Sequence, residues 1–318
     1  MGQKKEPFEI GPDGVAVAFV GDTHINGTTG LCPPDGFTLA DGGYYGPSPW
    51  QSQVWKIWQE FWRDFVPPRI GNAPLCTVLG GDIVEGNHHG TSQTISRNHH
   101  DQQEFAVKVL SPVCTLSTKG VYMLRGTPAH AGEAGHDEER IAAALGCKPD
   151  AGGRRARQVL RLQVGQFLVE ALHHGSGGAA GFGEAGGLAR ELADVCIAAA
   201  RNKQAVPDLV VRHHVHRACQ VHIPMSWGSA VGLAVPSWQL TTGYGYKLRG
   251  ARVNVPQVGA ALAVFYPTHF VVHSFTRFVP LVTTETLRPK RLGGVGGKAT
   301  GKAPRKGRHL GAGCGYIR

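Results

Sequence analysis

Short apolar runs recur along the chain and are separated by longer amphipathic segments, the pattern of a protein that contains both strands and helices. Val15–Val20 holds only apolar residues, which is typical of a strand buried on both faces. Gly165-Gln166 lies between two apolar runs and predicts the turn of a β-hairpin. The strands expected up to residue 211 are Val15–Val20, Leu75–Leu79, Val121–Leu124, Val159–Val164, Phe167–Leu172 and Leu209–Val211.

Helical periodicity is clearest in Trp50–Phe65, where aromatic residues recur at intervals of three and four. We interpret this aromatic stripe as core packing and expect Pro67-Pro68 to end the helix. Further helices are expected at about 98–116, 137–145 and 188–201. Four β-like runs follow, and they suggest a second sheet packed on the first: 218–223, 230–235, 260–266 and 270–278.

The domain organisation predicted from these patterns is one folded domain, residues 14–287, between two termini of different character. Residues 1–13 are expected to be a loose leader without an apolar signal segment. Residues 26–49 read as an insertion over the site, because loops of this length inside compact domains are usually functional or disordered. Three aromatic residues in this segment or directly after it would either stack on a base or sugar or fix the loop to the body: Tyr44, Tyr45 and Trp50.

Charge is unevenly distributed over the 318 residues, whose formal net charge is +10. No acidic residue follows Glu285, whereas nine Lys and Arg residues do. Residues 288–318 therefore read as a basic, glycine-rich, disordered tail that would contact nucleic acid phosphates in a salt-sensitive way. The seven cysteines are scattered, and no segment is long and apolar enough to span a bilayer. We expect a cytoplasmic protein with reduced thiols that does not associate with membranes; the oligomeric state is left open.

Acidic residues and histidines follow most of the predicted strands. Asp22 and His24 come directly after the first strand, and Asp82 follows the second. Carboxyl ends of strands in open α/β sheets gather ligands at one edge, so these side chains are expected to meet. Mixed carboxylate and imidazole ligands suit Mn²⁺, Fe or Zn²⁺ better than Mg²⁺ or Ca²⁺. The candidate set is large enough for two ions that share one carboxylate: Asp22, His24, Asp82, a residue within Thr127–His130, His173 or His174, His214 and His216.

The order of these motifs resembles the calcineurin-like metallophosphoesterases over about residues 15–220. Asp22-Thr23-His24 matches their Asp-x-His, Gly81-Asp82 their Gly-Asp, and His213-His214-Val215-His216 their Gly-His-x-His with a histidine in place of the glycine. The resemblance implies a four-layer α/β/β/α sandwich of two mixed sheets flanked by helices, with the site at the strand ends of the first sheet. It also implies two divalent ions, Mn²⁺ first and Fe or Zn²⁺ as alternatives. Asp22, His24 and His216 would hold one ion, His174 and His214 the other, with Asp82 between them and His173 as the competitor of His174.

The third motif departs from this pattern. Where the family has Gly-Asn-His, the chain has Gly126-Thr127-Pro128-Ala129-His130. Thr127 would replace the asparagine ligand, unless a water or His130 takes that position, and His130 is either the catalytic acid or part of the loop structure. Asn87, His88 and Arg125 are expected to contact the substrate phosphate. This divergence and the tyrosine-rich insertion resemble phosphoesterase-like proteins of phages and prophages.

The predicted function is hydrolysis of phosphate esters by a dinuclear metal centre, with nucleic acid phosphodiesters as the substrate class. The basic tail and the aromatic insertion favour nucleic acid. A phosphomonoesterase that acts on nucleotides or phosphoproteins is the alternative within the same class. Because the third motif is altered, a catalytically idle module that binds metal and nucleic acid is the alternative from another class.

Overall fold

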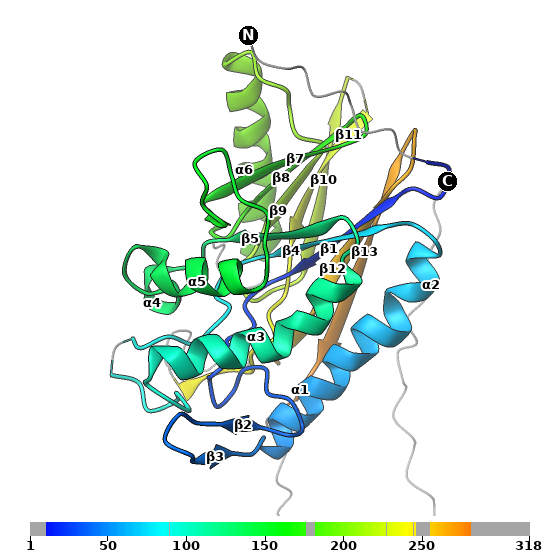
Figure 1. Ribbon diagram of the computed structural model, residues 1–318. Coiled ribbons are helices and arrows are strands. Elements are labelled where there is room, and N and C mark those ends of the chain that lie inside the picture. Colours follow the sequence, from blue (N-terminus) through cyan, green and yellow to red (C-terminus); the bar gives the residue numbers. More distant parts are fainter. Residues whose placement is uncertain are drawn as a thin grey trace, which may run out of the picture. The chain divides into compact units, whose positions relative to one another are not determined.

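The computed structural model describes residues 11–88, 90–175, 182–226, 228–243, 245 and 255–280, and all helices, strands and contacts reported lie within these ranges. Its first sheet has six strands in the order β13-β12-β1-β4-β5-β6 (Figure 1). Neighbouring strands from β1 to β6 are parallel, whereas β12 and β13 are antiparallel to their neighbours. The strands are β1 (Val15–Val20), β4 (Leu75–Leu79), β5 (Gly120–Leu124), β6 (Ala156–Arg157), β12 (Gln257–Phe265) and β13 (Phe270–Phe278).

The second sheet has five strands in the order β10-β11-β9-β8-β7. The hairpin predicted around Gly165-Gln166 forms its edge, with Val164 opposite Phe167. Strand β9 runs parallel to both β8 and β11, while β10 is antiparallel to β11. The strands are β7 (Val159–Val164), β8 (Phe167–Leu172), β9 (Leu209–Arg212), β10 (Cys219–Met225) and β11 (Gly228–Ala234).

The position of the last two strands corrects the sequence prediction. We expected all four runs after residue 217 to join the second sheet, but β12 and β13 complete the first. The physical reason lies in β1, whose six residues are all buried and whose open edge needs a hydrogen-bonding partner. Strand β12 supplies it, with Val15 opposite Phe265 and Phe19 opposite Ala261.

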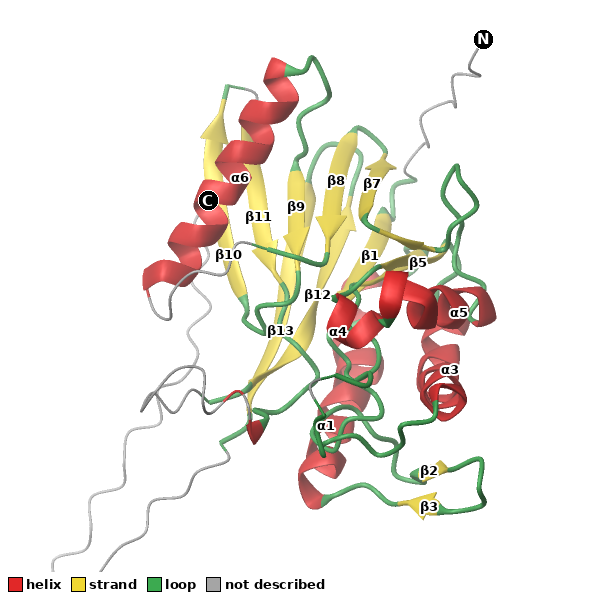
Figure 2. Ribbon diagram, turned by 90° about the vertical axis from the view of Figure 1, so that its left-hand side faces the viewer, coloured by secondary structure: helices red, strands yellow, loops and turns green. Residues whose placement is uncertain are grey.

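Three apolar layers separate four layers of structure, which confirms the predicted fold class. Alternate residues of β1 face opposite sides: Ala16 and Val20 join the core under the helices, whereas Val17 and Phe19 join the core between the two sheets. A third core lies between the second sheet and α6 (Phe182–Arg201), around Leu192 and Val210. Figure 2 shows α6 along β10 and β11, on the side of the sheets opposite to α1, α3 and α5.

The helices of the first sheet include the predicted aromatic helix, which the structure extends. Its α-helical part, α1 (Pro49–Glu60), continues as a π-helical turn, η1 (Phe61–Phe65), and then as α2 (Pro67–Ile70). Pro67-Pro68 therefore does not end the helix, contrary to the prediction. The π-helical turn, in which the Val66 N–H donates to Phe61 O, is followed by these two prolines, which have no N–H group to donate. The other helices on this side are α3 (His99–Leu116), α4 (Pro128–Ala131), η2 (Glu133–Gly135) and α5 (His136–Ala144).

The 26–49 segment contains a short hairpin of β2 (Phe37–Thr38) and β3 (Tyr44–Tyr45). Phe37 stacks on Phe105 of α3 with ring centroids 4.1 Å apart, and the Tyr45 hydroxyl donates to Gln51 Oε1 at 2.8 Å. Tyr45 thus fixes the loop to the body, the second of the two roles considered for these aromatic residues. Tyr44 is 65% and Trp50 45% exposed, so stacking by these two stays a prediction.

Two sequence predictions concern residues that the structure describes only in part or not at all. The basic tail, 288–318, lies outside the described residues, as does most of the leader. Among the helices in the described ranges, none has the length and apolar character that a bilayer span requires.

Candidate metal centre

The predicted ligands converge on an edge that both sheets share. Asp22 and His24 follow β1 and Asp82 follows β4 in the first sheet, whereas His173 follows β8 and His214 follows β9 in the second. Backbone hydrogen bonds join neighbouring strand ends within each sheet, from His213 N to His173 O (3.1 Å) and from Asp22 N to Gly81 O (2.9 Å), and His173 Nδ1 donates to Gly80 O (2.7 Å) between the sheets. We expected the site at the strand ends of the first sheet, but its residues follow strands of both sheets.

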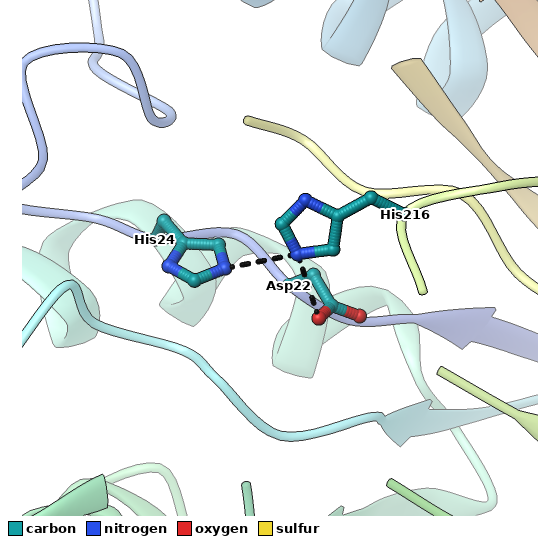
Figure 3. A group of neighbouring side chains, drawn as sticks. All are labelled: Asp22, His24 and His216. Carbon is teal, nitrogen blue, oxygen red and sulfur yellow. Dashed lines mark hydrogen bonds and ion pairs between the residues drawn. The ribbon is translucent and has the colours of Figure 1, made fainter. Parts of the chain in front are cut away.

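Asp22, His24 and His216 form the first group of metal-ligating side chains (Figure 3). His216 Nε2 lies 3.2 Å from Asp22 Oδ1 and 3.3 Å from His24 Nε2. The ring of His24 is oriented from behind, because its Nδ1 lies 3.1 Å from the buried carboxylate of Glu85. A carboxylate on the remote ring nitrogen is the usual partner of a metal-ligating histidine, and it leaves Nε2 for the ion.

Asp82, His173 and His214 form the second group. His173 Nδ1 donates to the carbonyl oxygen of Gly80 at 2.7 Å, and its Nε2 lies 3.1 Å from Asp82 Oδ2. Burial would lower the pKa of His173, but the Asp82 carboxylate 3.1 Å from its Nε2 and the charge of Asp22 raise it to about 10. The same pairing holds the pKa of Asp82 well below its usual range despite the burial of this carboxyl group.

His174, which the resemblance favoured as the ligand, belongs to neither group. Its side chain is exposed, and its ring centroid lies 5.2 Å from that of His173 and 5.3 Å from that of His214. His173, the alternative ligand that the sequence left open, lies in the group where His174 was predicted. His174 stays next to the site as a neighbour of both rings.

Backbone strain is concentrated at these side chains. Eight non-glycine residues have a positive φ among the described ranges, between 43° and 76°. Such conformations cost on the order of 1–3 kcal/mol each and cluster at functional sites, where the surrounding structure imposes them. Five of the eight are predicted metal ligands: Asp22, His24, Asp82, His214 and His216.

Asp82 is placed to be shared between the two groups. Besides His173 and His214, it forms a cluster with His24 and His130 whose ligand atoms all lie within 4.8 Å of one another. Thr127 donates to Asp82 Oδ1 twice, from its backbone N–H (2.7 Å) and from its hydroxyl (3.1 Å). The hydroxyl that was predicted to replace the family's amide ligand thus orients the shared carboxylate in this structure.

The donor set fits divalent cations. Asp22 Oδ1 and His173 Nε2 are buried and make no hydrogen bond of acceptable geometry. Asp22 Oδ1 nevertheless lies close to His216, and His173 Nε2 lies close to Asp82. His24 and His216 direct their Nε2 atoms at each other, where only one of the two could donate. Inward-facing carboxylate oxygens and imidazole nitrogens with their remote atoms engaged are the ligands that Mn²⁺, Fe or Zn²⁺ prefer.

His130, the predicted catalytic residue, lies beside the first group. Its ring contacts that of His24 edge-on at 4.5 Å between centroids, and its Nδ1 lies 2.6 Å from the carbonyl oxygen of Glu85. Burial and the neighbouring His24 lower the pKa of His130 to about 4. The imidazole is therefore neutral near pH 7, and its single N–H is directed at Glu85 O.

The predicted phosphate contacts have different surroundings. His88 lies at the site, with Nε2 3.2 Å from Glu85 Oε1 and its ring 4.6 Å from that of His130. Asn87 instead holds a loop to α3: it donates to Arg97 O at 2.8 Å and accepts from Gln102 at 3.0 Å. Arg125 packs over Gly135, where an added Cβ would come within 2.3 Å of its Nε. His89 lies outside the described residues.

Sequence reasoning missed two buried side chains that support the ligands. Glu138 of α5 is fully buried, and its carboxylate accepts from the backbone N–H groups of Gly126 (2.6 Å) and Ile83 (3.3 Å). It therefore joins the loop of Thr127 to the loop of Asp82. Gln239 donates to Glu85 Oε2 at 2.6 Å and fixes the carboxylate behind His24. Neither residue lies in a motif, so no local signal marks them.

His213, which stands where the family has a glycine, is fully buried against the strand ends. An added Cβ would come within 2.5 Å of its ring at Gly21 and within 2.3 Å at Gly80. The two glycines provide the space that the imidazole fills. Burial lowers the pKa of His213 to about 4, so the ring is neutral and acts as packing between the two sheets.

Comparisons with known proteins give structural similarity only. No family model matches the sequence, and no curated protein matches it. A conserved uncharacterized protein from Streptococcus pneumoniae TIGR4, described as a predicted phosphoesterase, is 10% identical, with 83% of this chain and 98% of that chain covered and a TM-score of 0.31. A metallophosphoesterase from Sphaerobacter thermophilus is 11% identical over 82% of this chain and 88% of its own (TM-score 0.35).

The sulfate thiohydrolase SoxB of Thermus thermophilus is a third similar structure. It is 12% identical, with 85% of this chain and 58% of that chain covered and a TM-score of 0.35. Similarities with TM-scores this low do not define the family or the activity of this chain.

Proposed function

We propose that the chain hydrolyses phosphate esters with a dinuclear metal centre held by Asp22, His24 and His216 on one side and by Asp82, His173 and His214 on the other. The observation that carries this proposal is the pair of three-residue groups, each with its ligand atoms within 4.8 Å of one another. Both groups lie at the edge where the strand ends of the two sheets meet. The left-handed backbone at five of these six residues supports it independently.

The chemistry follows from the arrangement of the ligands. When bound, two divalent ions supply Lewis-acid polarisation of a phosphate and a lower pKa for an attacking water. Asp82 would contribute to both ion sites, since its carboxylate is held in one orientation by Thr127 and by His173. Glu85 and the Gly80 carbonyl lie against the Nδ1 atoms of His24 and His173, which leaves the Nε2 atoms of both rings directed inward.

We further propose a phosphodiester of nucleic acid as the substrate and nucleic acid as the partner of residues 288–318. The nine basic residues after Glu285 support this, since cationic segments attract phosphate backbones. The exposed aromatic rings of Tyr44 and Trp50 offer stacking surfaces for unpaired bases. We propose Mn²⁺ as the native metal, with Fe or Zn²⁺ as alternatives, because the ligand set mixes carboxylates and imidazoles.

The test is metal content by mass spectrometry together with hydrolysis of bis-p-nitrophenyl phosphate with and without Mn²⁺. At least two ions per chain and Mn²⁺-dependent turnover are expected. Asp82→Asn should lower turnover at least ~100-fold because it removes the shared carboxylate. His222→Ala is the matched control, because His222 is exposed on β10. A protein that binds the ions but releases no product with any divalent metal would instead be an idle binding module.

The preferred ester follows from a second comparison on the same protein. Under the proposal, the diester substrate is hydrolysed faster than p-nitrophenyl phosphate, the corresponding monoester. A single-stranded oligonucleotide should then be cleaved in a salt-dependent way. A higher rate on the monoester would point to the phosphomonoesterase alternative and leave the metal centre unchanged.

A further inference from the structure

Glu85, His88 and His130 form another cluster of metal-ligating side chains beside the dinuclear centre. Their ligand atoms all lie within 4.8 Å of one another. Glu85 and His88 come from the loop after β4, and His130 from α4 after β5. Of the three, only His130 also belongs to a group that contains Asp82, so the cluster adds Glu85 and His88 to the ligands already described.

Two of the three side chains, Glu85 and His130, are oriented through an atom that the cluster does not need. Glu85 Oε2 accepts from Gln239 (2.6 Å) and lies 3.1 Å from His24 Nδ1, which leaves Oε1 directed at His88. His130 Nδ1 donates to the Glu85 carbonyl oxygen at 2.6 Å, so its other nitrogen carries a lone pair. Engagement of the remote atoms is the arrangement that fixes metal ligands in place.

The separation of the ligand atoms matches a common ion between them. Glu85 Oε1 and His88 Nε2 lie 3.2 Å apart. Two ligands about 2.1 Å from one tetrahedral ion lie roughly 3.4 Å from each other, and slightly closer in an octahedral shell. Glu85 is 3% and His88 19% exposed, so the cluster is shielded on the protein side and open toward solvent on the other.

We propose that Glu85, His88 and His130 hold a third divalent cation next to the dinuclear centre. One carboxylate and two imidazoles with a solvent-facing side is the ligand set of catalytic sites that keep a position open for water or substrate. The inference rests on the proposed function, because a third cation beside the other two would add to the positive charge that stabilises a phosphate. It also assigns His130 to ion binding in place of proton donation.

The experiment counts bound Mn²⁺ per chain by equilibrium dialysis of the full-length protein against free Mn²⁺, with the metal alone as the probe. Wild type should hold three ions, and His88→Ala should hold two, since His88 belongs only to the third site. His100→Ala is the matched control: His100 is an exposed histidine of α3 and should leave three ions in place. Melting curves of all three proteins in EDTA show whether the variants fold.

The outcomes separate this inference from the proposed function. A decrease from three ions to two in His88→Ala, with three ions kept by His100→Ala and Mn²⁺-dependent turnover by the wild type, supports the third site. Two ions in both wild type and His88→Ala, with turnover, would overturn the third site and leave the dinuclear centre intact. Three ions in both would place the third ion elsewhere and equally overturn it. Fewer than two ions without turnover contradicts the proposed function itself.

Discussion

His173 donates from Nδ1 to the carbonyl oxygen of Gly80 over 2.7 Å and so directs Nε2 at Asp82. The strand-end residue of the second sheet is thus oriented by the backbone of the first, at the position where the two sheets meet. His174, one residue later, belongs to neither metal-ligating group.

This relationship predicts different effects for two adjacent histidines. His173→Ala should remove one Mn²⁺ ion per chain and lower kcat/KM on the model diester at least ~100-fold, because it deletes a ligand and unbalances the buried Asp82. His174→Ala should keep the metal content and change kcat/KM less than ~10-fold. Metal analysis and steady-state kinetics of both variants check this. The reverse order of effects would restore His174 as the ligand.

Thr127 is expected to act through Asp82. Thr127→Val keeps the side-chain volume but removes the hydroxyl that lies 3.1 Å from Asp82 Oδ1, whereas the backbone N–H still donates at 2.7 Å. The number of bound ions should stay the same, and the affinity for Mn²⁺ should fall about 10-fold, the usual effect of losing a partner of a ligand. Titration with Mn²⁺ measures both quantities. Loss of a whole ion would show that the hydroxyl is itself a ligand.

Burial raises the pKa of Glu138 from 4.5 to about 7, with the charge of Asp82 as a further cause. A carboxyl group whose pKa is raised by folding does not destabilise the protein at a pH below its unfolded pKa. As the pH rises from the unfolded pKa through the folded pKa, the group ionises more readily in the unfolded chain, so the folded protein loses stability. The metal-free protein should therefore lose on the order of 3 kcal/mol between about pH 4 and pH 8 relative to Glu138→Gln. Urea unfolding of both proteins in EDTA at several pH values measures the difference. Parallel pH profiles would show that folding does not raise the pKa of Glu138.

Gly80 and His213 should be coupled. A Cβ on Gly80 would come within 2.3 Å of the His213 ring, which is fully buried. Gly80→Ala should lower the free energy of unfolding by about 1–3 kcal/mol through overpacking. In a His213→Ala background the same change should cost less, since the ring is gone. Gly186→Ala in α6 is the control, because a Cβ added there would have no atom within 4 Å. Equal costs in both backgrounds would contradict the coupling.

The sequence was sufficient for the strands that carry ligands, because a fully apolar run such as Val15–Val20 followed by Asp22 and His24 has few other interpretations. It did not determine the partner of β12, since alternation of apolar residues encodes which face is buried and not which edge is paired. The choice between His173 and His174 depends on the direction of the chain after β8, which a difference of one residue reverses. Glu138 contacts Gly126 and Ile83 through the tertiary fold alone, so no local pattern announces it.

The left-handed backbone at five predicted ligands implies opposed selection at these positions. Glycine adopts such a conformation without strain, so His216→Gly should stabilise the metal-free chain by about 1 kcal/mol and raise its melting temperature while it removes a ligand. A lineage that no longer needed the centre would accumulate glycine at residues 22, 24, 82, 214 and 216. The retention of aspartate and histidine there would record continued use of the site.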